Sequence, residues 1–109
     1  MQKENIVEHA LHYMEEHYNS RLTLEEVAQH VYISPWYLSQ VFNQYMERSF
    51  PTIRNQIRIK YAKQMLKESD FPIFVIAEMV GFQASCHFSR TFKKIVGISP
   101  DEYRNSQFF

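Results

Sequence analysis

Apolar residues recur at every third or fourth position along most of the chain, which is the period of an amphipathic α-helix. The first apolar stripe covers residues 5–18 and stops at Asn19 and Ser20, where the pattern breaks. Further stripes of the same period follow over residues 23–31, 35–46, 50–68, 73–80, 85–96 and 99–105. The pattern therefore predicts an all-α fold of about seven helices.

Capping residues stand in front of three of these stripes. In a capping box, a Ser or Thr and a Glu three positions later each accept a hydrogen bond from the other's backbone N–H, and Pro suits the first helical position. The predicted starts are Thr23 with Glu26, Ser34 with Pro35, and Ser99 with Pro100 and Glu102.

Two of the stripes, over residues 35–46 and 85–96, are expected to bury large side chains. The expected core residues are Leu38, Val41, Phe42 and Tyr45 in the first, and Phe88, Phe92 and Ile95 in the second. A shorter stripe precedes each of them, and Gly81, which readily takes the left-handed conformation, marks a sharp turn before the second. Helix, turn, helix is the outline of a helix-turn-helix motif, and the sequence predicts it twice.

The two predicted motifs form an internal repeat. At a separation of fifty residues, Trp36 matches Cys86, Ser39 matches Ser89, Gln40 matches Arg90, Phe42 matches Phe92 and Asn43 matches Lys93. Upstream, Ala28 matches Ala77 and Ile33 matches Phe82 at a separation of forty-nine, so the second turn is expected to be one residue longer. The repeat covers core positions and outward-facing positions alike.

A longer stripe over residues 50–68 joins the two motifs. Its expected buried residues are Ile53, Ile57, Tyr61, Met65 and Leu66. At 1.5 Å per residue, such a helix spans about 27 Å, and recognition helices in successive major grooves lie about 34 Å apart. The stretch also carries basic residues with no acid between 48 and 67: Arg48, Arg54, Arg58, Lys60, Lys63 and Lys67.

Charge is unevenly distributed, although the net charge is zero. Residues 1–47 hold two Lys or Arg against seven acidic residues, and residues 48–109 hold ten against five. Such asymmetry indicates a polyanionic partner for the basic half.

Residues 73–104 contain two consecutive motifs, I-x-x-I-A-x-x-V-G-F and F-S-R-x-F-K-K-x-x-G-x-S-P-x-x-Y-R. They resemble the signature of the AraC/XylS family of bacterial transcription regulators, and they cover about a third of the chain. The resemblance implies a DNA-binding unit of about one hundred residues, with two helix-turn-helix motifs joined by a long helix. It places the first motif at about 23–46, the linker helix at about 50–68 and the second motif at about 72–96, within one domain over 1–109.

The same resemblance implies sequence-specific binding of double-stranded DNA, with recognition helices at about 35–46 and 85–96 in successive major grooves. RNA polymerase is the second expected partner, and the isolated domain is expected to be a monomer. The candidate DNA-binding residues are Trp36, Ser39, Gln40, Asn43, Ser85, Cys86, His87, Ser89, Arg90, Lys93 and Lys94.

The first recognition helix departs from the family pattern. Where the family often carries Arg and paired Lys, this chain has Gln40, Asn43 and Gln44, and Glu47 stands where Gly often closes the motif. We therefore expect the second helix to supply most of the electrostatic affinity, because each missing phosphate contact lowers the salt dependence of binding.

Other classes of function find little support in the sequence. The chain lacks a P-loop, a nucleophile elbow and a Gly-rich cofactor motif, so an enzyme is not expected, nor is a cofactor. No Cys or acidic residue completes a metal site with His9, His12 and His17 at a usual spacing. The single cysteine and the lack of a membrane span or signal sequence fit a cytoplasmic protein.

One alternative from another class remains open. The chain could be a small helical module that binds a protein through Trp36, Tyr37 and the terminal Phe108 and Phe109. Binding that weakens steeply with salt favours DNA as the partner, and salt-insensitive binding favours a protein.

Overall fold

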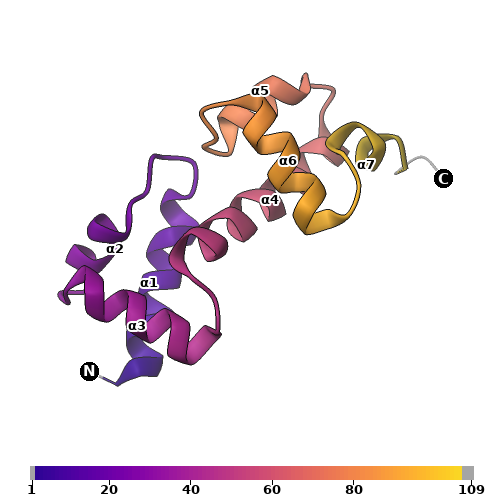
Figure 1. Ribbon diagram of the computed structural model, residues 1–109. Coiled ribbons are helices and arrows are strands. Elements are labelled where there is room, and N and C mark those ends of the chain that lie inside the picture. The colour runs from indigo at the N-terminus through magenta and orange to yellow at the C-terminus, as the bar shows by residue number, and fades with distance from the viewer. Residues whose placement is uncertain (1, 107–109) are drawn as a thin grey trace. The chain divides into compact units, whose positions relative to one another are not determined.

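The computed structural model describes residues 2–106. In this part of the chain seven helices form and no strand occurs, which confirms the predicted all-α fold (Figure 1). The helices are α1 (Lys3–His17), α2 (Leu24–His30), α3 (Pro35–Met46), α4 (Phe50–Glu68), α5 (Ile73–Met79), α6 (Ser85–Val96) and α7 (Pro100–Ser106). The chain divides into two compact units, Met1–Arg54 and Asn55–Phe109, and α4 runs across their boundary.

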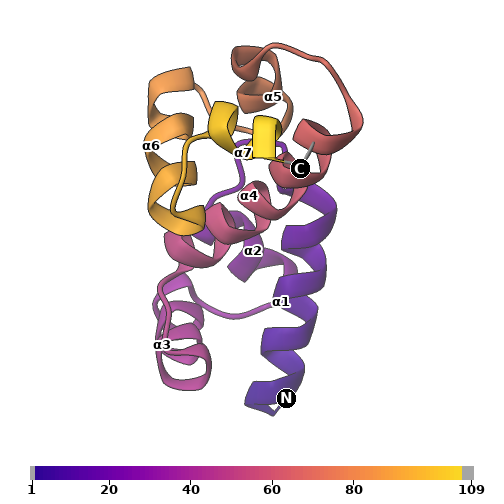
Figure 2. The same cartoon turned by 90° about the vertical axis from the view of Figure 1, so that its right-hand side faces the viewer.

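The first unit is built on α1, α2 and α3, which pack against one another (Figure 2). Its core contains Ile6, Val7, Ala10 and Met14 of α1, Leu22, Val27, Ala28 and Val31 in and around α2, and Leu38, Val41 and Phe42 of α3. The start of α4 adds Phe50, whose ring centroid lies 6.4 Å from that of Phe42. Full burial of one large apolar side chain contributes about 1.5–3 kcal/mol, so these contacts dominate the unit's stability.

The second unit contains the rest of α4 with α5, α6 and α7. A row of aromatic rings runs through it: Phe82 lies 5.3 Å from Phe88, Phe88 lies 5.8 Å from Phe92, and Phe92 lies 5.6 Å from Tyr103, centroid to centroid. The row joins the turn before α6, the buried face of α6, and α7. Arg104 of α7 adds hydrogen bonds to the carbonyl oxygens of Leu66 and Ser69, at 3.4 and 3.3 Å.

The three predicted helix starts are capped as follows. The hydroxyls of Thr23 and Ser34 accept hydrogen bonds from the N–H groups three residues on, both at 3.1 Å. At α7 the box is reciprocal, because Ser99 N–H donates to Glu102 Oε1 and Glu102 N–H donates to Ser99 Oγ. The predicted reciprocal box at α2 is wrong in one arm, since the Glu26 carboxylate instead accepts a 2.6 Å hydrogen bond from the Tyr13 hydroxyl of α1.

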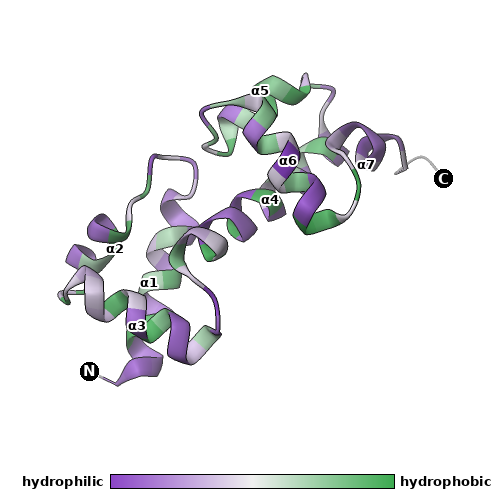
Figure 3. Ribbon diagram, in the orientation of Figure 1, coloured by the Kyte–Doolittle hydropathy of each residue, from purple (hydrophilic) through white to green (hydrophobic). Residues whose placement is uncertain are grey.

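Helix α4 differs from the single apolar stripe predicted for it. Ile53, Ile57 and Leu66 are buried as expected, but Ile59, Ala62 and the charged Arg58 are buried as well, whereas Tyr61 and Met65 are only half-buried. Figure 3 shows hydrophobic and hydrophilic residues interspersed along this helix. The reason is that α4 contributes to two cores, so its buried residues do not share one face.

Two predicted core residues are exposed. Tyr45 of α3 is 50% exposed and Ile95 of α6 is 42% exposed, although both follow the apolar period of their helices. They stand fifty residues apart, each in the last turn before its helix ends. Periodicity gives the direction in which a side chain points, but not how far along the helix the core extends.

Candidate nucleic-acid interface

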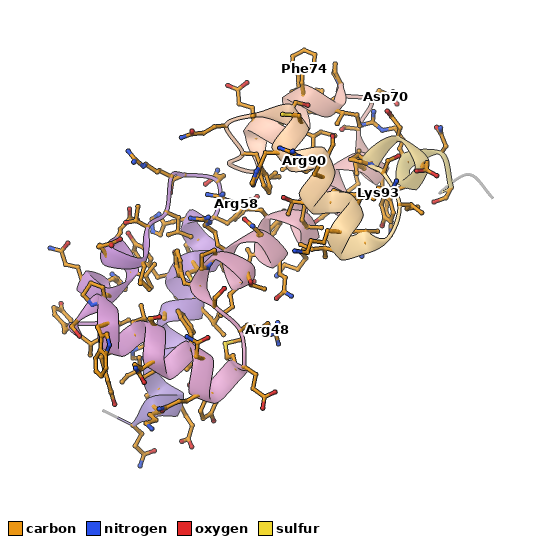
Figure 4. The ribbon with its side chains drawn as sticks, in the orientation of Figure 1. Arg48, Arg58, Asp70, Phe74, Arg90 and Lys93 are labelled. Atoms are coloured by element: carbon orange, nitrogen blue, oxygen red, sulfur yellow. The ribbon has the colours of Figure 1, made fainter. Side chains whose placement is uncertain are left out.

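Helix α6 carries a cationic outer face opposite a fully buried aromatic one. Phe88 and Phe92 are completely buried, whereas Arg90, Lys93 and Lys94 are exposed. Figure 4 labels Arg90 and Lys93 on this helix. The candidate residues Ser85, Cys86 and His87 at its N-terminus are also exposed, and Ser89 is half-buried. This face therefore offers several hydrogen-bond donors and three positive charges to a partner.

Two neighbours shape the cationic face. The His87 ring packs at 5.4 Å from the Phe82 ring, which orients this side chain at the start of the helix. Near the helix end, the pKa of Glu102 is lowered, first by its hydrogen bond from the Ser99 backbone, then by that from the Ser99 side chain and by the charge of Lys93. Glu102 thus stays ionised near Lys93 and offsets part of its charge.

Helix α3 presents an outer face without charge at the equivalent positions. Trp36 is 70% exposed, so it does not fold back onto the turn, and Asn43 is exposed while Ser39 and Gln40 are half-buried. The Asn43 amide donates a 3.0 Å hydrogen bond to the Ser39 carbonyl, and Gln44 accepts one from Lys3 at 3.0 Å. The face thus combines the Trp36 ring with amide side chains. Two of these amides, those of Asn43 and Gln44, already make hydrogen bonds within the protein.

The turns before α3 and α6 close with the same hydrogen bonds. In the first, Tyr32 N–H donates to Gln29 O and Ile33 N–H donates to Ala28 O, at 3.2 and 3.1 Å. In the second, Gly81 N–H donates to Glu78 O and Phe82 N–H donates to Ala77 O, at 3.0 and 2.9 Å. Both are Schellman motifs, which need one residue in the left-handed conformation. Gly81 takes it with φ 103°, and Tyr32 takes it with φ 62°.

Two of the basic residues of α4, Arg54 and Arg58, take part in the packing of the fold, whereas Lys60 and Lys67 are exposed. Arg58 is only 5% exposed, with its guanidinium carbon 5.5 Å from the centre of the Phe82 ring. Arg54 is half-buried and donates a 3.2 Å hydrogen bond to the Leu22 carbonyl, and burial lowers the pKa of its guanidinium. The long alkyl chains of both residues pack while their charged ends find partners or an aromatic face.

Apolar side chains are also exposed away from the two recognition faces. On and beside α5 they are Phe71, Phe74 and Met79, and in Figure 4 the Phe74 ring points away from the ribbon of its unit. The Tyr37 side chain of the protein-binding alternative is at the edge of exposure, at 36%. Phe108 and Phe109, which belong to the same alternative, lie outside the described residues.

Residues 2–106 contain neither a membrane-spanning helix nor a metal-binding cluster. No helix there is long and apolar enough to cross a membrane. In the same range, no group of three or more His, Cys, Asp or Glu side chains is placed to hold a metal ion. Cys86 is a free, exposed thiol in the first turn of α6.

The helix-turn-helix domain family matches residues 27–106, which is most of the chain. The C-terminal domain of AraT, a response regulator from Geobacillus stearothermophilus, has a TM-score of 0.87 and 39% identity, covering 93% of this chain and 84% of that chain. A transcriptional regulator from Chromobacterium violaceum, described as an AraC-type DNA-binding domain protein, has a TM-score of 0.89 and 26% identity, covering 94% of this chain and 91% of that chain. The chain belongs to the AraC/XylS family.

A curated member of the AraC/XylS family extends the comparison. The arabinose operon regulatory protein of Escherichia coli strain K12 is 39% identical over 102 residues, which is 93% of this chain and 35% of that protein. The chain spans about a third or less of the length of the curated relatives it matches. The AraC/XylS family and these relatives are regulators, which places the chain among regulators rather than enzymes.

Proposed function

We propose that this chain is the DNA-binding domain of a bacterial transcription regulator, and that it reads duplex DNA by placing α3 and α6 each in a major groove. The observation that carries the proposal is the outer face of α6, where Arg90, Lys93 and Lys94 are exposed directly opposite the buried Phe88 and Phe92. Arg pairs with guanine edges and Lys with phosphates, so this face is suited to a major groove. Membership of the AraC/XylS family supports the same role.

Helices α3 and α6 have different roles in this proposal. Helix α6 supplies most of the electrostatic affinity, and α3 contributes base discrimination through Trp36 and Gln40, since an exposed ring suits thymine methyl groups and an amide suits adenine. The proposed contact residues are Trp36, Ser39, Gln40, Asn43, Ser85, Cys86, His87, Ser89, Arg90, Lys93 and Lys94.

Selection of bound duplexes from a random DNA pool at near-physiological salt tests the proposal directly. The expected product is two short preferred boxes whose centres lie about ten base pairs apart, one for each helix. A single box would show that α3 contributes no base reading. No enrichment at all, together with salt-insensitive binding to a protein, would replace the proposal with the protein-binding alternative.

Salt dependence separates phosphate contacts from base contacts. Lys94→Ala should weaken binding to every sequence alike and reduce the slope of log affinity against log salt by about one unit, because one fewer counterion is released. Gln44→Ala is the matched control, since Gln44 stands fifty residues earlier and carries no charge. An unchanged slope for Lys94→Ala in fluorescence anisotropy titrations would remove Lys94 from the phosphate contacts.

The proposal has three further parts. They are RNA polymerase as a second partner, a monomeric state for the isolated domain and a cytoplasmic location. Sedimentation equilibrium of the domain with and without duplex tests the monomer, and co-purification with RNA polymerase from cells that carry the selected operator tests the second partner.

A further inference from the structure

Tyr32 is the most exposed of the large hydrophobic side chains in the described residues, and its backbone is left-handed. It is 92% exposed, with φ at 62°. A bulky residue in this conformation is strained, because its Cβ approaches the neighbouring carbonyl oxygen. Such strain persists only where the surrounding structure imposes it, and it concentrates at functional sites. Here the Schellman hydrogen bonds impose it, and at this exposure the side chain has little protein around it to offset the cost.

The repeat shows which residue this position suits. Gly81 stands at the same place in the second Schellman motif, forty-nine residues later, and takes the left-handed conformation without a side chain to clash. The first motif therefore holds an exposed aromatic residue where glycine would satisfy the fold. The stability of the folded chain does not account for Tyr32, and its almost fully exposed aromatic ring is available for a contact outside the chain.

The place of Tyr32 between α2 and α3 points to DNA as the partner of its side chain. In a helix-turn-helix motif the first helix crosses the DNA backbone and the N-terminal residues of the second reach base edges. Tyr32 lies between α2 and α3, two residues before the capping Ser34 and four before the exposed Trp36. In that docking geometry, a side chain between the two helices is near the sugar-phosphate strand beside the groove.

We propose that Tyr32 contacts DNA, with its hydroxyl donating a hydrogen bond to a phosphate beside the box that α3 reads. The inference rests on the proposed function and adds a residue that periodicity did not mark. A Tyr hydroxyl is one of the usual neutral donors to phosphate, and such contacts fix the orientation of a protein on the duplex without reading sequence. Because the donor is uncharged, it releases no counterion, and the contact adds affinity without adding salt dependence.

Two substitutions separate the strain from the contact. Tyr32→Gly should raise the thermal unfolding midpoint by about 4 °C or more, since relief of a left-handed residue recovers on the order of 1 kcal/mol. The same change should lower the affinity about tenfold for every duplex, with the salt slope unchanged. Tyr32→Phe keeps the strain and removes only the hydroxyl, so it should leave the midpoint in place and lose the same tenfold in affinity.

Glu47→Gly is the matched control, because Glu47 is left-handed as well, with φ 57°, and stands at the other end of α3. It should raise the midpoint without lowering affinity. Wild-type affinity for Tyr32→Phe would overturn the phosphate contact, and wild-type affinity for Tyr32→Gly would overturn any DNA contact by Tyr32. In either case, a loss of affinity for Arg90→Ala would show that the proposed function stands, whereas wild-type binding by Arg90→Ala as well would show that α6 does not read DNA.

Discussion

The two helix-turn-helix motifs of this chain share their buried core positions but differ in the charge of their exposed faces. Phe42 and Phe92 occupy equivalent positions fifty residues apart, and both are fully buried. The outer faces differ in charge, since Gln40 and Asn43 stand where the second motif has Arg90 and Lys93. Duplicated packing thus supports two surfaces with different chemistry.

The motifs also differ in how well their residues suit the backbone. Both glycines of the chain lie in the second motif, and both are left-handed: Gly81 in the turn and Gly97 at the end of α6. The first motif places Tyr32 and Glu47 at the corresponding positions, with φ of 62° and 57°. The second motif is therefore locally consistent with its fold, while the first carries local conflicts that the rest of its unit must overcome.

Truncation of the two equivalent core rings should have the largest effect. Phe92→Ala and Phe42→Ala should each cost about 3–5 kcal/mol in the free energy of unfolding, because each leaves a cavity at a fully buried site. Urea unfolding followed by circular dichroism measures both. A clearly smaller cost for Phe42→Ala would mean that the first motif collapses around the cavity more readily than the second.

Removal of the two equivalent polar side chains compares the recognition faces. Arg90→Ala should cost about 1–3 kcal/mol in DNA binding and relax selectivity at one base pair, because it removes the guanidinium that we propose contacts a base edge. Gln40→Ala should cost less, since its side chain is uncharged and half-buried. Titration against single-base variants of the selected operator measures both changes. If Gln40→Ala cost as much as Arg90→Ala, the two faces would be equal partners after all.

Substitutions at the equivalent C-terminal ends of α3 and α6 test how much the left-handed residues affect stability. Gly97→Ala should destabilise the chain by about 1–2 kcal/mol, although no atom lies within 4 Å of the added methyl group, because the left-handed φ of 101° alone is unfavourable. Glu47→Gly should stabilise it by roughly 1 kcal/mol for the converse reason. Thermal unfolding reports both. Equal stability of all three proteins would show that left-handed strain has no role in the difference between the motifs.

The smallest expected effect concerns the reciprocal capping box of α7, which has no counterpart at α2. Glu102 accepts its hydrogen bond from Ser99, which lowers its pKa below the ordinary 4.5, whereas Glu26 of the first motif bonds Tyr13 instead. A lowered folded-state pKa contributes stability that is present above the ordinary value and lost as pH falls through the folded value. The Ser99 amide chemical shift should therefore titrate at a pH below 4.5. Glu102→Gln should abolish that titration, and its persistence would assign the effect to another group.

Local chemistry made much of the fold predictable from sequence. The seven helices, the caps at Thr23, Ser34 and Ser99, and the longer second turn follow from residue types at fixed short spacings. Gly81 predicted a left-handed turn, but nothing in the apolar period predicted the left-handed conformation of Tyr32. Only the alignment of the two turns at a separation of forty-nine residues places Tyr32 at the position of Gly81.

The features that periodicity missed depend on contacts between distant residues. Burial of Arg58 follows from the two cores that share α4, and exposure of Tyr45 and Ile95 follows from where each core stops. The Glu26 carboxylate accepts a hydrogen bond from Tyr13 of α1 instead of from the backbone at the start of its own helix. The spacing of a capping box does not show which of these two donors is used. For the candidate interface, the exposed faces of α3 and α6 were predictable, but which of their residues contact DNA is left to the experiments above.

Because Arg104 bonds to the end of α4, the two units become complete at different times during synthesis. The first unit has its whole length once Arg54 has been added, so its core can form while later residues are still being made. The hydrogen bonds that join α7 to the end of α4 can form only after Arg104 has been added, fifty residues later, because its guanidinium donates to the carbonyls of Leu66 and Ser69. At about 5–20 residues per second, a ribosome leaves an interval of roughly 3–10 s between the two events. During that interval, the part of α4 that belongs to the second unit lacks the completed core against which it packs in the folded chain.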